Sequence, residues 1–442
     1  MSGSDVIFKV SPGGKLTGSI RVPGDKSISH RSIMLGSLAE GTTHVSGFLE
    51  GEDNLATLNA FRAMGVNIQG PENSHVTIEG VGMHGLKAPA MTLDVGNSGT
   101  SIRLLSGLLA AQSFDCVLTG DSSLSKRPMR RVTDPLVQMG AIVETTAEGT
   151  PPLKIKGSSA LKGFHYKMPV ASAQVKSCLL LAGLYAEGET CVTEPAPTRD
   201  HTERMLEGFG YQVERKGSTV CVKGGGKLLA TDIDVPADIS SAAFFLVGAS
   251  ISQGSDLTLQ HVGMNPTRDG VINILRLMGA DILVSNEQTI GGEPVADIRV
   301  RSARLKGIQI PEEQVPLAID EFPAIFIAAA CADGETVLTG ARELRVKESD
   351  RIQVMADGMQ ILGIDAHPTE DGIVIQGKGS EAEVFGSGQV DSHGDHRIAM
   401  SFTMAALRAA GQITITDCAN VNTSFPGFIK LSSETGINIQ QG

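Results

Sequence analysis

A short signature that recurs six times constrains the fold of this chain more than any other feature. In each copy, an apolar segment of helical character ends in a glycine, and a β-prone segment follows. The six copies are AMGVNI at Gly65, QMGAIV at Gly140, GFGYQV at Gly210, LMGADI at Gly279, ILGIDA at Gly363 and ETGINI at Gly436. Successive glycines are 75, 70, 69, 84 and 73 residues apart, by subtraction. A glycine in this position is typical of a helix end where the chain turns left-handed, so the signature predicts six related units.

Two further elements recur with the signature. Upstream of each copy lies a β-type segment, and these segments are GTTHVSGF, FDCVLTG, GETCVTEP, GSDLTLQH, GETVLTGA and GQITITDC. A polar loop that leads into an apolar helix lies between the units, in the segments DKSISHRSIMLGSLA, GNSGTSIRLLSGLLA, ASAQVKSCLLLAGLYA, ADISSAAFFLVGAS, IDEFPAIFIAAACA and GDHRIAMSFTMAALRA. Each unit is therefore predicted to read loop, helix, strand, loop, helix, strand.

The length of 442 residues favours two domains, because single hydrophobic cores rarely grow beyond about 250–300 residues. Six units divide naturally into three per half, with boundaries near VPGD (22–25) and VPAD (235–238). A cleft between two such halves is a preferred place for a ligand. A solenoid without catalytic function is the alternative, but its repeats usually have about 20–45 residues.

The composition excludes several classes of protein. The net charge of −12 argues against nucleic acid or an anionic membrane as the main partner. No apolar run approaches the ~20 residues of a membrane span, and the N-terminal segment MSGSDVIFKV does not resemble a signal peptide, so we expect a cytoplasmic protein. The six cysteines form no C-x-x-C pair, and we expect neither a disulfide nor a structural zinc.

The polar loops of the units carry residue types that bind anions. They contain Lys26, Ser27, Arg31, Gly99, Arg103, Lys126, Arg127, Ser172, Gln174, Lys176, Arg199, Arg268, Arg345, Lys347, Arg351 and Arg397. Loops that precede helices favour anions through free N–H groups and the helix dipole, and guanidinium groups bind phosphate and carboxylate bidentately. A single surface cation is usually only solvated, and Ser27 or Ser172 could simply cap a helix. The joint pattern predicts a site for small anions.

Two carboxylates in these loops are candidates for acid–base chemistry. Asp320 precedes the apolar segment EFPAIF, and its alternative role is to cap that helix. Glu348 lies between Lys347 and Ser349, and its alternative role is an ion pair with Lys347 or Arg351.

Two other motifs suggest different kinds of binding site, and we reject both. GVGMHG (80–85) matches a dinucleotide-binding pattern, but Pro89 interrupts the helix that should follow. His393, Asp395 and His396 could suggest a metal site, yet Arg397 is an unfavourable neighbour for a cation. We therefore predict no metal.

The loops resemble, in order and over nearly the whole chain, those of the 5-enolpyruvylshikimate-3-phosphate synthase family. The matching segments are PGDKSISHR (23–31), GNSGTSIR (96–103), KRPM (126–129), SAQVKS (172–177), RDHTE (199–203), IDEFP (319–323), RVKESDR (345–351), GDHRIAM (394–400) and TSFPGF (423–428). The resemblance implies an α/β (α+β) fold of two domains, each of three βαβαββ repeats, in the inside-out, barrel-like enolpyruvyl transferase arrangement. The implied domains are 23–236, and 1–22 with 237–442.

The resemblance also implies the reaction. The 5-hydroxyl of shikimate 3-phosphate attacks C2 of phosphoenolpyruvate while C3 is protonated, and phosphate then leaves. No cofactor is expected, and we expect a monomer. The segments SAQVKS and RDHTE resemble the class II branch of the family, some members of which resist the inhibitor glyphosate. Resistant relatives carry Ala where this chain has Gly99, so we do not expect insensitivity and expect a glyphosate target. Thr423 stands where many relatives have Lys, so no cationic contact is expected from that loop.

The implied site residues fall into three sets. The shikimate 3-phosphate set is Lys26, Ser27, Arg31, Ser172, Gln174, Arg199, Asp320 and Lys347; the phosphoenolpyruvate set is Lys26, Gly99, Arg127, Gln174, Arg351 and Arg397. The implied catalytic residues are Asp320 as proton acceptor from the 5-hydroxyl, and Glu348 with Lys26 as proton donor to C3. These roles suit a reaction that needs proton relays and fixed cations.

Two alternatives stay open. The UDP-N-acetylglucosamine enolpyruvyl transferase shares the fold, but it would require a reactive cysteine in a mobile loop, and Cys116 lies in a strand-like segment. A non-catalytic anion-binding module is the other alternative, and the presence of both Asp320 and Glu348 disfavours it.

Overall fold

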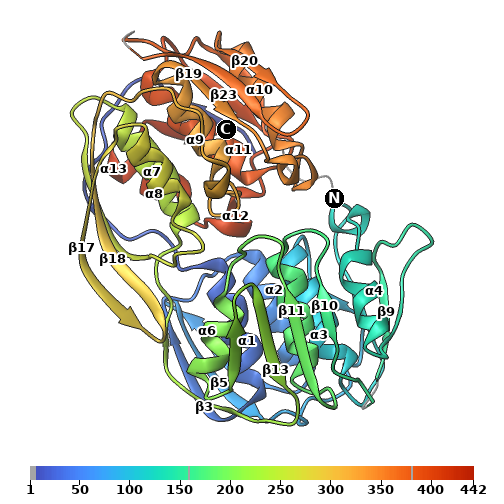
Figure 1. Cartoon of the computed structure of the whole chain (residues 1–442). Coiled ribbons are helices and arrows are strands. Elements are labelled where there is room, and N and C mark those ends of the chain that lie inside the picture. Colours follow the sequence, from blue (N-terminus) through green and yellow to red (C-terminus); the bar gives the residue numbers. More distant parts are fainter. Residues whose placement is uncertain (1–5, 158–159, 380–381) are drawn as a thin grey trace. The chain divides into compact units, whose positions relative to one another are not determined.

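The computed structural model describes residues 6–157, 160–379 and 382–442. The chain forms two compact units, shown with their elements in Figure 1. Unit 1 comprises 1–23, 236–289 and 294–442, and unit 2 comprises 24–235 and 290–293. Each unit has its own large hydrophobic core.

The described residues of unit 2 form three sheets. Their strands are β3 (Ala39–Ser46), β4 (Asn67–Glu72), β5 (His75–Val81), β14 (Leu228–Leu229) and β15 (Ile233–Asp234); β6 (Leu93–Asp94), β7 (Cys116–Thr119), β8 (Ile142–Glu144) and β9 (Leu153–Lys156); β10 (His165–Lys167), β11 (Glu189–Thr193), β12 (Val213–Lys216) and β13 (Thr219–Lys223). Its helices are α1 (Lys26–Leu38), α2 (Glu52–Ala63), α3 (Gly99–Ala110), the 3-10 turn η1 (Leu124–Lys126), α4 (Arg130–Gln138), α5 (Ala173–Gly183) and α6 (His201–Gly208).

Unit 1 has the same kind of organisation. Its strands are β2 (Thr17–Ile20), β16 (Asp256–Gly263), β17 (Asp281–Ile290) and β18 (Glu293–Arg301); β19 (Asp333–Leu338), β20 (Asp365–Pro368) and β21 (Ile373–Lys378); β1 (Phe8–Val10), β22 (Gly388–Asp391), β23 (Ile413–Thr416) and β24 (Ile439–Gln441). Its helices and turns are α7 (Ile239–Ile251), α8 (Gly270–Leu277), η2 (Glu312–Gln314), α9 (Phe322–Ala330), η3 (Arg342–Val346), α10 (Arg351–Ile361), α11 (His396–Ala405), η4 (Ala406–Arg408), α12 (Val421–Ser424) and α13 (Phe428–Thr435).

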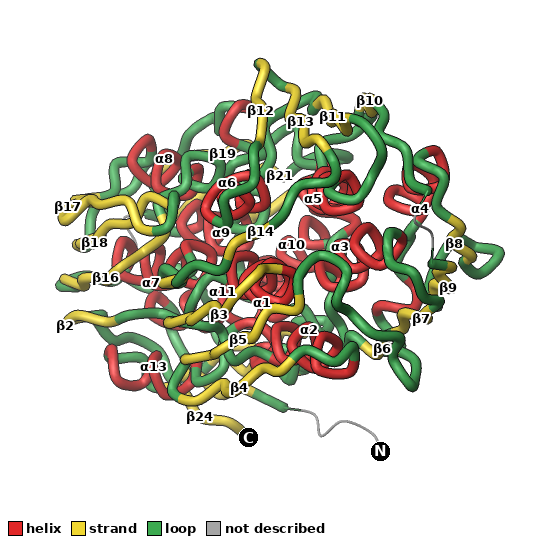
Figure 2. Tube along the Cα trace, turned by 90° about the horizontal axis from the view of Figure 1, so that it is seen from below, coloured by secondary structure: helices red, strands yellow, loops and turns green. Residues whose placement is uncertain are grey.

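Five of the six sheets among the described residues share one strand order, and the sixth, β19-β21-β20, has only its three antiparallel strands. In β6-β7-β9-β8 and β10-β11-β13-β12, the first pair is parallel and the others are antiparallel. The order β17-β18-β16-β2 is the same arrangement read backwards, and these four strands lie side by side at the left of Figure 2. In β22-β23-β1-β24, the N-terminal strand β1 completes the last sheet of unit 1. This repetition confirms the expected α/β fold of βαβαββ repeats.

The six predicted helix ends are confirmed. All six signature glycines have left-handed backbones, with φ between +77° and +119°. The six predicted apolar helices are α1, α3, α5, α7, α9 and α11, and all 13 residues of α7 are buried. A helix that is apolar on every side belongs in a core. The predicted order of elements within a unit is incomplete. One strand is expected after the second helix of each unit, but a hairpin of two strands, such as β8–β9, follows it.

The expectation of no disulfide is wrong. Cys191 and Cys221 form a disulfide between β11 and β13, with Cα atoms 4.1 Å apart. The two residues are directly opposite each other in the antiparallel register, where side chains are close enough to bond. The other four cysteines are free and buried.

Among the described residues, no helix is long and apolar enough to cross a membrane.

Candidate active site

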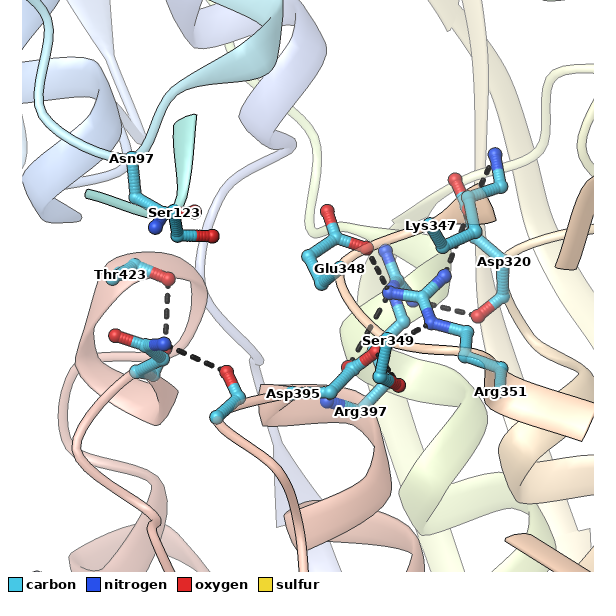
Figure 3. Close-up of polar contacts among 12 residues, drawn as sticks. Asn97, Ser123, Asp320, Lys347, Glu348, Ser349, Arg351, Asp395, Arg397 and Thr423 are labelled. Carbon is cyan, nitrogen blue, oxygen red and sulfur yellow. Dashed lines mark hydrogen bonds and ion pairs between the residues drawn. The ribbon is translucent and has the colours of Figure 1, made fainter. Parts of the chain in front are cut away.

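A cluster of charged side chains surrounds Arg351 in unit 1 (Figure 3). Arg351 begins α10, and its side chain is only 1% exposed. Its guanidinium contacts three carboxylates: Nη2 donates to Glu348 Oε2 at 2.6 Å, Nη1 to Asp320 Oδ1 at 3.2 Å, and Nε to Asp395 Oδ2 at 2.8 Å. Burial acts to lower the pKa of Arg351, but these carboxylates raise it above its ordinary value overall. The guanidinium is therefore a fixed positive charge.

Asp395 joins the loops that carry this cluster. It is fully buried at the N-cap of α11, where Oδ1 accepts from the backbone N–H of Arg397 at 2.9 Å. Its Oδ2 also accepts from the hydroxyl of Ser349 at 3.0 Å. One carboxylate thus fixes the start of α11 and the side chain of Arg351 together.

Asp320 lies between two cations. Its Oδ1 is 3.5 Å from Lys347 Nζ, in addition to the contact with Arg351, and its side chain is 15% exposed. Its backbone oxygen accepts from Nη1 of Arg397 at 3.0 Å. The alternative role as helix cap is wrong, because the N-cap of α9 is Glu321. The alternative ion pair of Glu348 with Arg351 does form, and Glu348 stays 31% exposed beside it.

The first cationic side chains of unit 2 belong to α1. Arg31 is buried, and its guanidinium donates to Thr202 Oγ1 at 2.7 Å, to Ser177 Oγ at 2.8 Å and to the backbone oxygen of Ser27 at 3.0 Å. Burial lowers the pKa of Arg31 to about 10, and the nearby charge of Arg199 acts in the same direction. Lys26 forms an ion pair with Asp53 at 2.5 Å. Asp25, and not Ser27, caps α1, since its Oδ1 accepts from Ile28 N.

A second group in unit 2 surrounds the start of α3. Gln174 Oε1 accepts from Arg103 Nη1 at 2.6 Å, and its Nε2 donates to Thr100 Oγ1 at 3.0 Å. Arg127 Nη2 donates to Asn97 Oδ1 at 2.6 Å. A Cβ atom on Gly99 would lie 3.0 Å from Arg103 Nη1 and 3.1 Å from Arg127 Nη1. Glycine therefore leaves the room that these two guanidinium groups occupy.

Two further predicted positions of unit 2 have plain structural explanations. Ser172 is the N-cap of α5, where its hydroxyl accepts from Val175 N, so the capping role is confirmed for Ser172. Lys176 is 1% exposed and lies between Glu194 at 2.5 Å and Glu203 at 2.7 Å. Burial raises the pKa of Glu203, and the neighbouring Lys176 opposes that rise. Lys176 thus belongs to a buried ion cluster.

The structure brings the predicted residues together in two groups. Asp320, Lys347, Glu348, Arg351 and Arg397 contact one another within unit 1. The predicted residues of unit 2 are Lys26, Ser27, Arg31, Gly99, Arg127, Ser172, Gln174 and Arg199. All but Arg31, in the second turn of α1, lie at or just before the starts of α1, α3, α4, α5 and α6. Sequence reasoning missed Asp395 as a partner of Arg351, although its place before an apolar helix is a cap signal that could have pointed to it.

One group of possible metal ligands lies together among the described residues. It consists of His165, Glu189 and Cys191. The sulfur of Cys191 is already bonded to Cys221, and a disulfide sulfur is not the thiolate that binds a metal. His393 and His396 do not join such a group with Asp395 within the described chain.

Comparison with known proteins gives one consistent result. Residues 10–431 match the family model described as EPSP synthase (3-phosphoshikimate 1-carboxyvinyltransferase). The chain is 69% identical to a 3-phosphoshikimate 1-carboxyvinyltransferase of Methylococcus capsulatus, covering 100% of both chains, and 66% identical to one of Nitrosococcus oceani, covering 100% of this chain and 98% of the relative. A solved structure of EPSP synthase from Acinetobacter baumannii is 63% identical, with a TM-score of 0.91 over 99% of this chain and 100% of the other.

Proposed function

The chain belongs to the EPSP synthase family, and from that premise we propose how its own residues divide the work of the reaction. The enzyme transfers the enolpyruvyl group of phosphoenolpyruvate to the 5-hydroxyl of shikimate 3-phosphate and releases phosphate, in the shikimate pathway. This addition requires a proton acceptor for the hydroxyl, a proton donor for C3, and cations that bind two anionic substrates. The cluster around Arg351 offers all three kinds of group.

Asp320 is the proposed proton acceptor. Its contacts with Arg351 at 3.2 Å and Lys347 at 3.5 Å stabilise the ionised carboxylate. A carboxylate has to be ionised to accept a proton, and the 15% exposure of Asp320 leaves it accessible to a substrate. This placement between two cations is the observation that carries the proposal.

Glu348 is the proposed proton donor to C3, together with Lys26. It shares Arg351 with Asp320 but is about twice as exposed. An anion that binds beside Glu348 favours the protonated form of its carboxyl group, because like charges repel. Binding of phosphoenolpyruvate would thus favour the protonated form of Glu348, which the reaction needs as a proton donor.

Two sets of residues are proposed to hold the substrates, and both include residues already proposed for proton transfer. The set for shikimate 3-phosphate is Lys26, Ser27, Arg31, Ser172, Gln174, Arg199, Asp320 and Lys347, and the set for phosphoenolpyruvate is Lys26, Gly99, Arg127, Gln174, Arg351 and Arg397. Helix starts are suited to this role through their free N–H groups. The backbones at Lys26 and Gly99 occupy such positions, at the first residues of α1 and α3.

The replacement Asp320→Asn tests the assignment of the proton acceptor. Asparagine has the same shape but is a poor base, so we expect kcat to fall about 10²–10⁴-fold, while calorimetry shows shikimate 3-phosphate still bound. Asp357→Asn is a suitable control, because Asp357 is exposed on α10 and bonds only to Gln353 in the same helix among the contacts of the described residues. A kcat for Asp320→Asn equal to that of the control would refute the assignment.

The UDP-N-acetylglucosamine enolpyruvyl transferase is not favoured. Cys116 lies in β7, and burial raises the pKa of its thiol to about 12, which keeps it in the unreactive protonated form. The family model and the relatives also name the other acceptor. An assay of both acceptors with phosphoenolpyruvate decides between them.

Several properties of the enzyme complete the proposal. We propose that the protein is a cytoplasmic monomer and a target of glyphosate, with domain limits at 23–236 and at 1–22 with 237–442. A net charge of −12 supports small-molecule partners over nucleic acid.

A further inference from the structure

Glu321 is a buried carboxylate that the proposed reaction does not use. It immediately follows Asp320, and its side chain is 1% exposed. Its Oε1 lies 3.9 Å from Nη1 of Arg397, which also donates to the backbone oxygen of Asp320 at 3.0 Å. A buried carboxylate is costly unless nearby charges and donors compensate it, so the contact with Arg397 matters to both residues.

A chain of hydrogen bonds fixes Glu321 from its other side. The hydroxyl of Ser240, in the first turn of α7, donates to Oε1 of Glu321. The same hydroxyl accepts from Nη2 of Arg268 at 2.5 Å, and Arg268 Nη2 also bonds Asp238 Oδ1 at 2.9 Å. Asp238 caps α7 by accepting from Ser240 N at 2.8 Å. The carboxylate of Glu321 is thus held against a helix start.

The contact leaves the donors of Arg397 available for a substrate. A guanidinium group has five N–H donors, and among the described residues the structure gives its side chain one hydrogen bond, to Asp320 O. Glu321 attracts the charge at 3.9 Å without taking a hydrogen bond of ordinary length. An attraction of this kind orients the guanidinium group of Arg397 and leaves its N–H groups able to bind a substrate.

We propose that Glu321 is a positioning residue for Arg397, held in place by Ser240 and Arg268, and that it thereby sets the affinity for phosphoenolpyruvate. This inference rests on the proposed function, since it takes Arg397 as a ligand of phosphoenolpyruvate. It predicts that changes at Glu321 act on one substrate and not on the other.

Steady-state kinetics of Glu321→Gln provides the test. Glutamine keeps the shape and the hydrogen bond from Ser240 but loses the charge, so we expect KM for phosphoenolpyruvate to rise about 10-fold, as for a lost charge contact in a buried site. We expect kcat and KM for shikimate 3-phosphate to stay within about twofold. Glu313→Gln, at an exposed glutamate of η2, is the matched control.

Ser240→Ala provides a second, independent readout. If Ser240 acts through Glu321, the double variant with Glu321→Gln should show the same KM as Glu321→Gln alone. Ser250→Ala is its control, because Ser250 is buried in the same helix and its hydroxyl bonds only to Leu246 O among the described contacts. If the two changes instead raise KM for phosphoenolpyruvate by independent factors that multiply, Ser240 does not act through Glu321.

The outcomes separate this inference from the proposed function. If the wild-type enzyme does not turn over the two substrates, the proposed function fails. If it does, and Glu321→Gln changes the melting temperature but leaves KM for phosphoenolpyruvate unchanged, Glu321 has only a structural role and the inference is overturned.

Discussion

Replacing Asp395 with asparagine tests how the Arg351 cluster is held. Asparagine caps a helix about as well as aspartate, so the bond from Arg397 N to Oδ1 is kept and only the charge is lost. Breaking a fully buried ion pair costs about 3–5 kcal/mol. Arg351 keeps two carboxylates, Glu348 at 2.6 Å and Asp320 at 3.2 Å, so we expect a loss near ~2 kcal/mol, in the range for one charged hydrogen bond.

Differential scanning calorimetry measures this loss as a shift of the transition of unit 1. For a body of this size, 1 kcal/mol corresponds to about 2–4 °C, so Asp395→Asn should lower the melting temperature by about 4–8 °C. The matched control is Asp350→Asn. Asp350 also caps a helix and pairs with an arginine, Arg345 at 2.6 Å, but these side chains are 36% and 24% exposed. A pair of that exposure contributes ~1 kcal/mol or less. Equal shifts for the two variants would refute the argument that burial makes the Asp395 contact strong.

Three other predictions follow from unit 2. Gly99→Ala places a Cβ 3.1 Å from Arg127 Nη1, so KM for phosphoenolpyruvate should rise about 3–10-fold, the effect of ~1 kcal/mol of overpacking; an unchanged KM contradicts the proposed role of Arg127. Cys191→Ser with Cys221→Ser opens a loop of 30 residues, and calorimetry should show a loss of about 3–4 kcal/mol in unit 2; dithiothreitol should bring the wild type to the same stability, and no change on either treatment would count against the bridge. Burial, with the charges of Lys26 and Arg31, lowers the pKa of His30 in the folded protein well below 6.5. His30 of the unfolded chain therefore takes up a proton at a higher pH than His30 of the folded protein. The free energy of unfolding should thus fall as the pH falls below about 6.5, by up to ~1.4 kcal/mol per pH unit. Urea unfolding of His30→Asn at pH 7.5 and 5.5 should lack this part of the pH dependence, and an identical slope would exclude His30 as its source.

The repeat is the part of the fold that the sequence predicts best. Gly65 and the five equivalent glycines mark helix ends because a left-handed residue is a local requirement of the chain, which the residue type itself records. The apolar helices are equally visible, since a segment such as 239–251 has no polar face to expose. These features depend on neighbours within a few residues.

The contacts between distant residues were not predictable in the same way. Cys191 and Cys221 become partners only because the register of β11 and β13 places them opposite each other. Asp395 is 44 residues from Arg351, and Glu321 is 81 residues from Ser240. No local pattern encodes such pairs, because they depend on the packing of whole elements. The resemblance supplied residue roles, but it supplied none of these supporting contacts.

The charges of unit 1 bear on our proposal that Glu348 donates a proton and that Asp320 accepts one. Four carboxylates, Asp320, Glu321, Glu348 and Asp395, lie beside three cations, Lys347, Arg351 and Arg397. An anionic substrate adds negative charge to a set in which carboxylates already outnumber cations. A unit charge at ~4 Å changes the energy of its neighbour by about 4 kcal/mol at an effective dielectric constant of ~20, and one pKa unit corresponds to only about 1.4 kcal/mol.

We therefore propose that a proton enters this cluster with the substrate. The two carboxylates that we propose as catalytic, Asp320 and Glu348, differ in their surroundings. Asp320 lies between Lys347 and Arg351, which both oppose its protonation. Glu348 contacts Arg351 at 2.6 Å, and its 31% exposure leaves it open to an approaching substrate. We propose that the proton goes to Glu348, where a donor to C3 is needed, while Asp320 stays ionised to accept the proton of the hydroxyl.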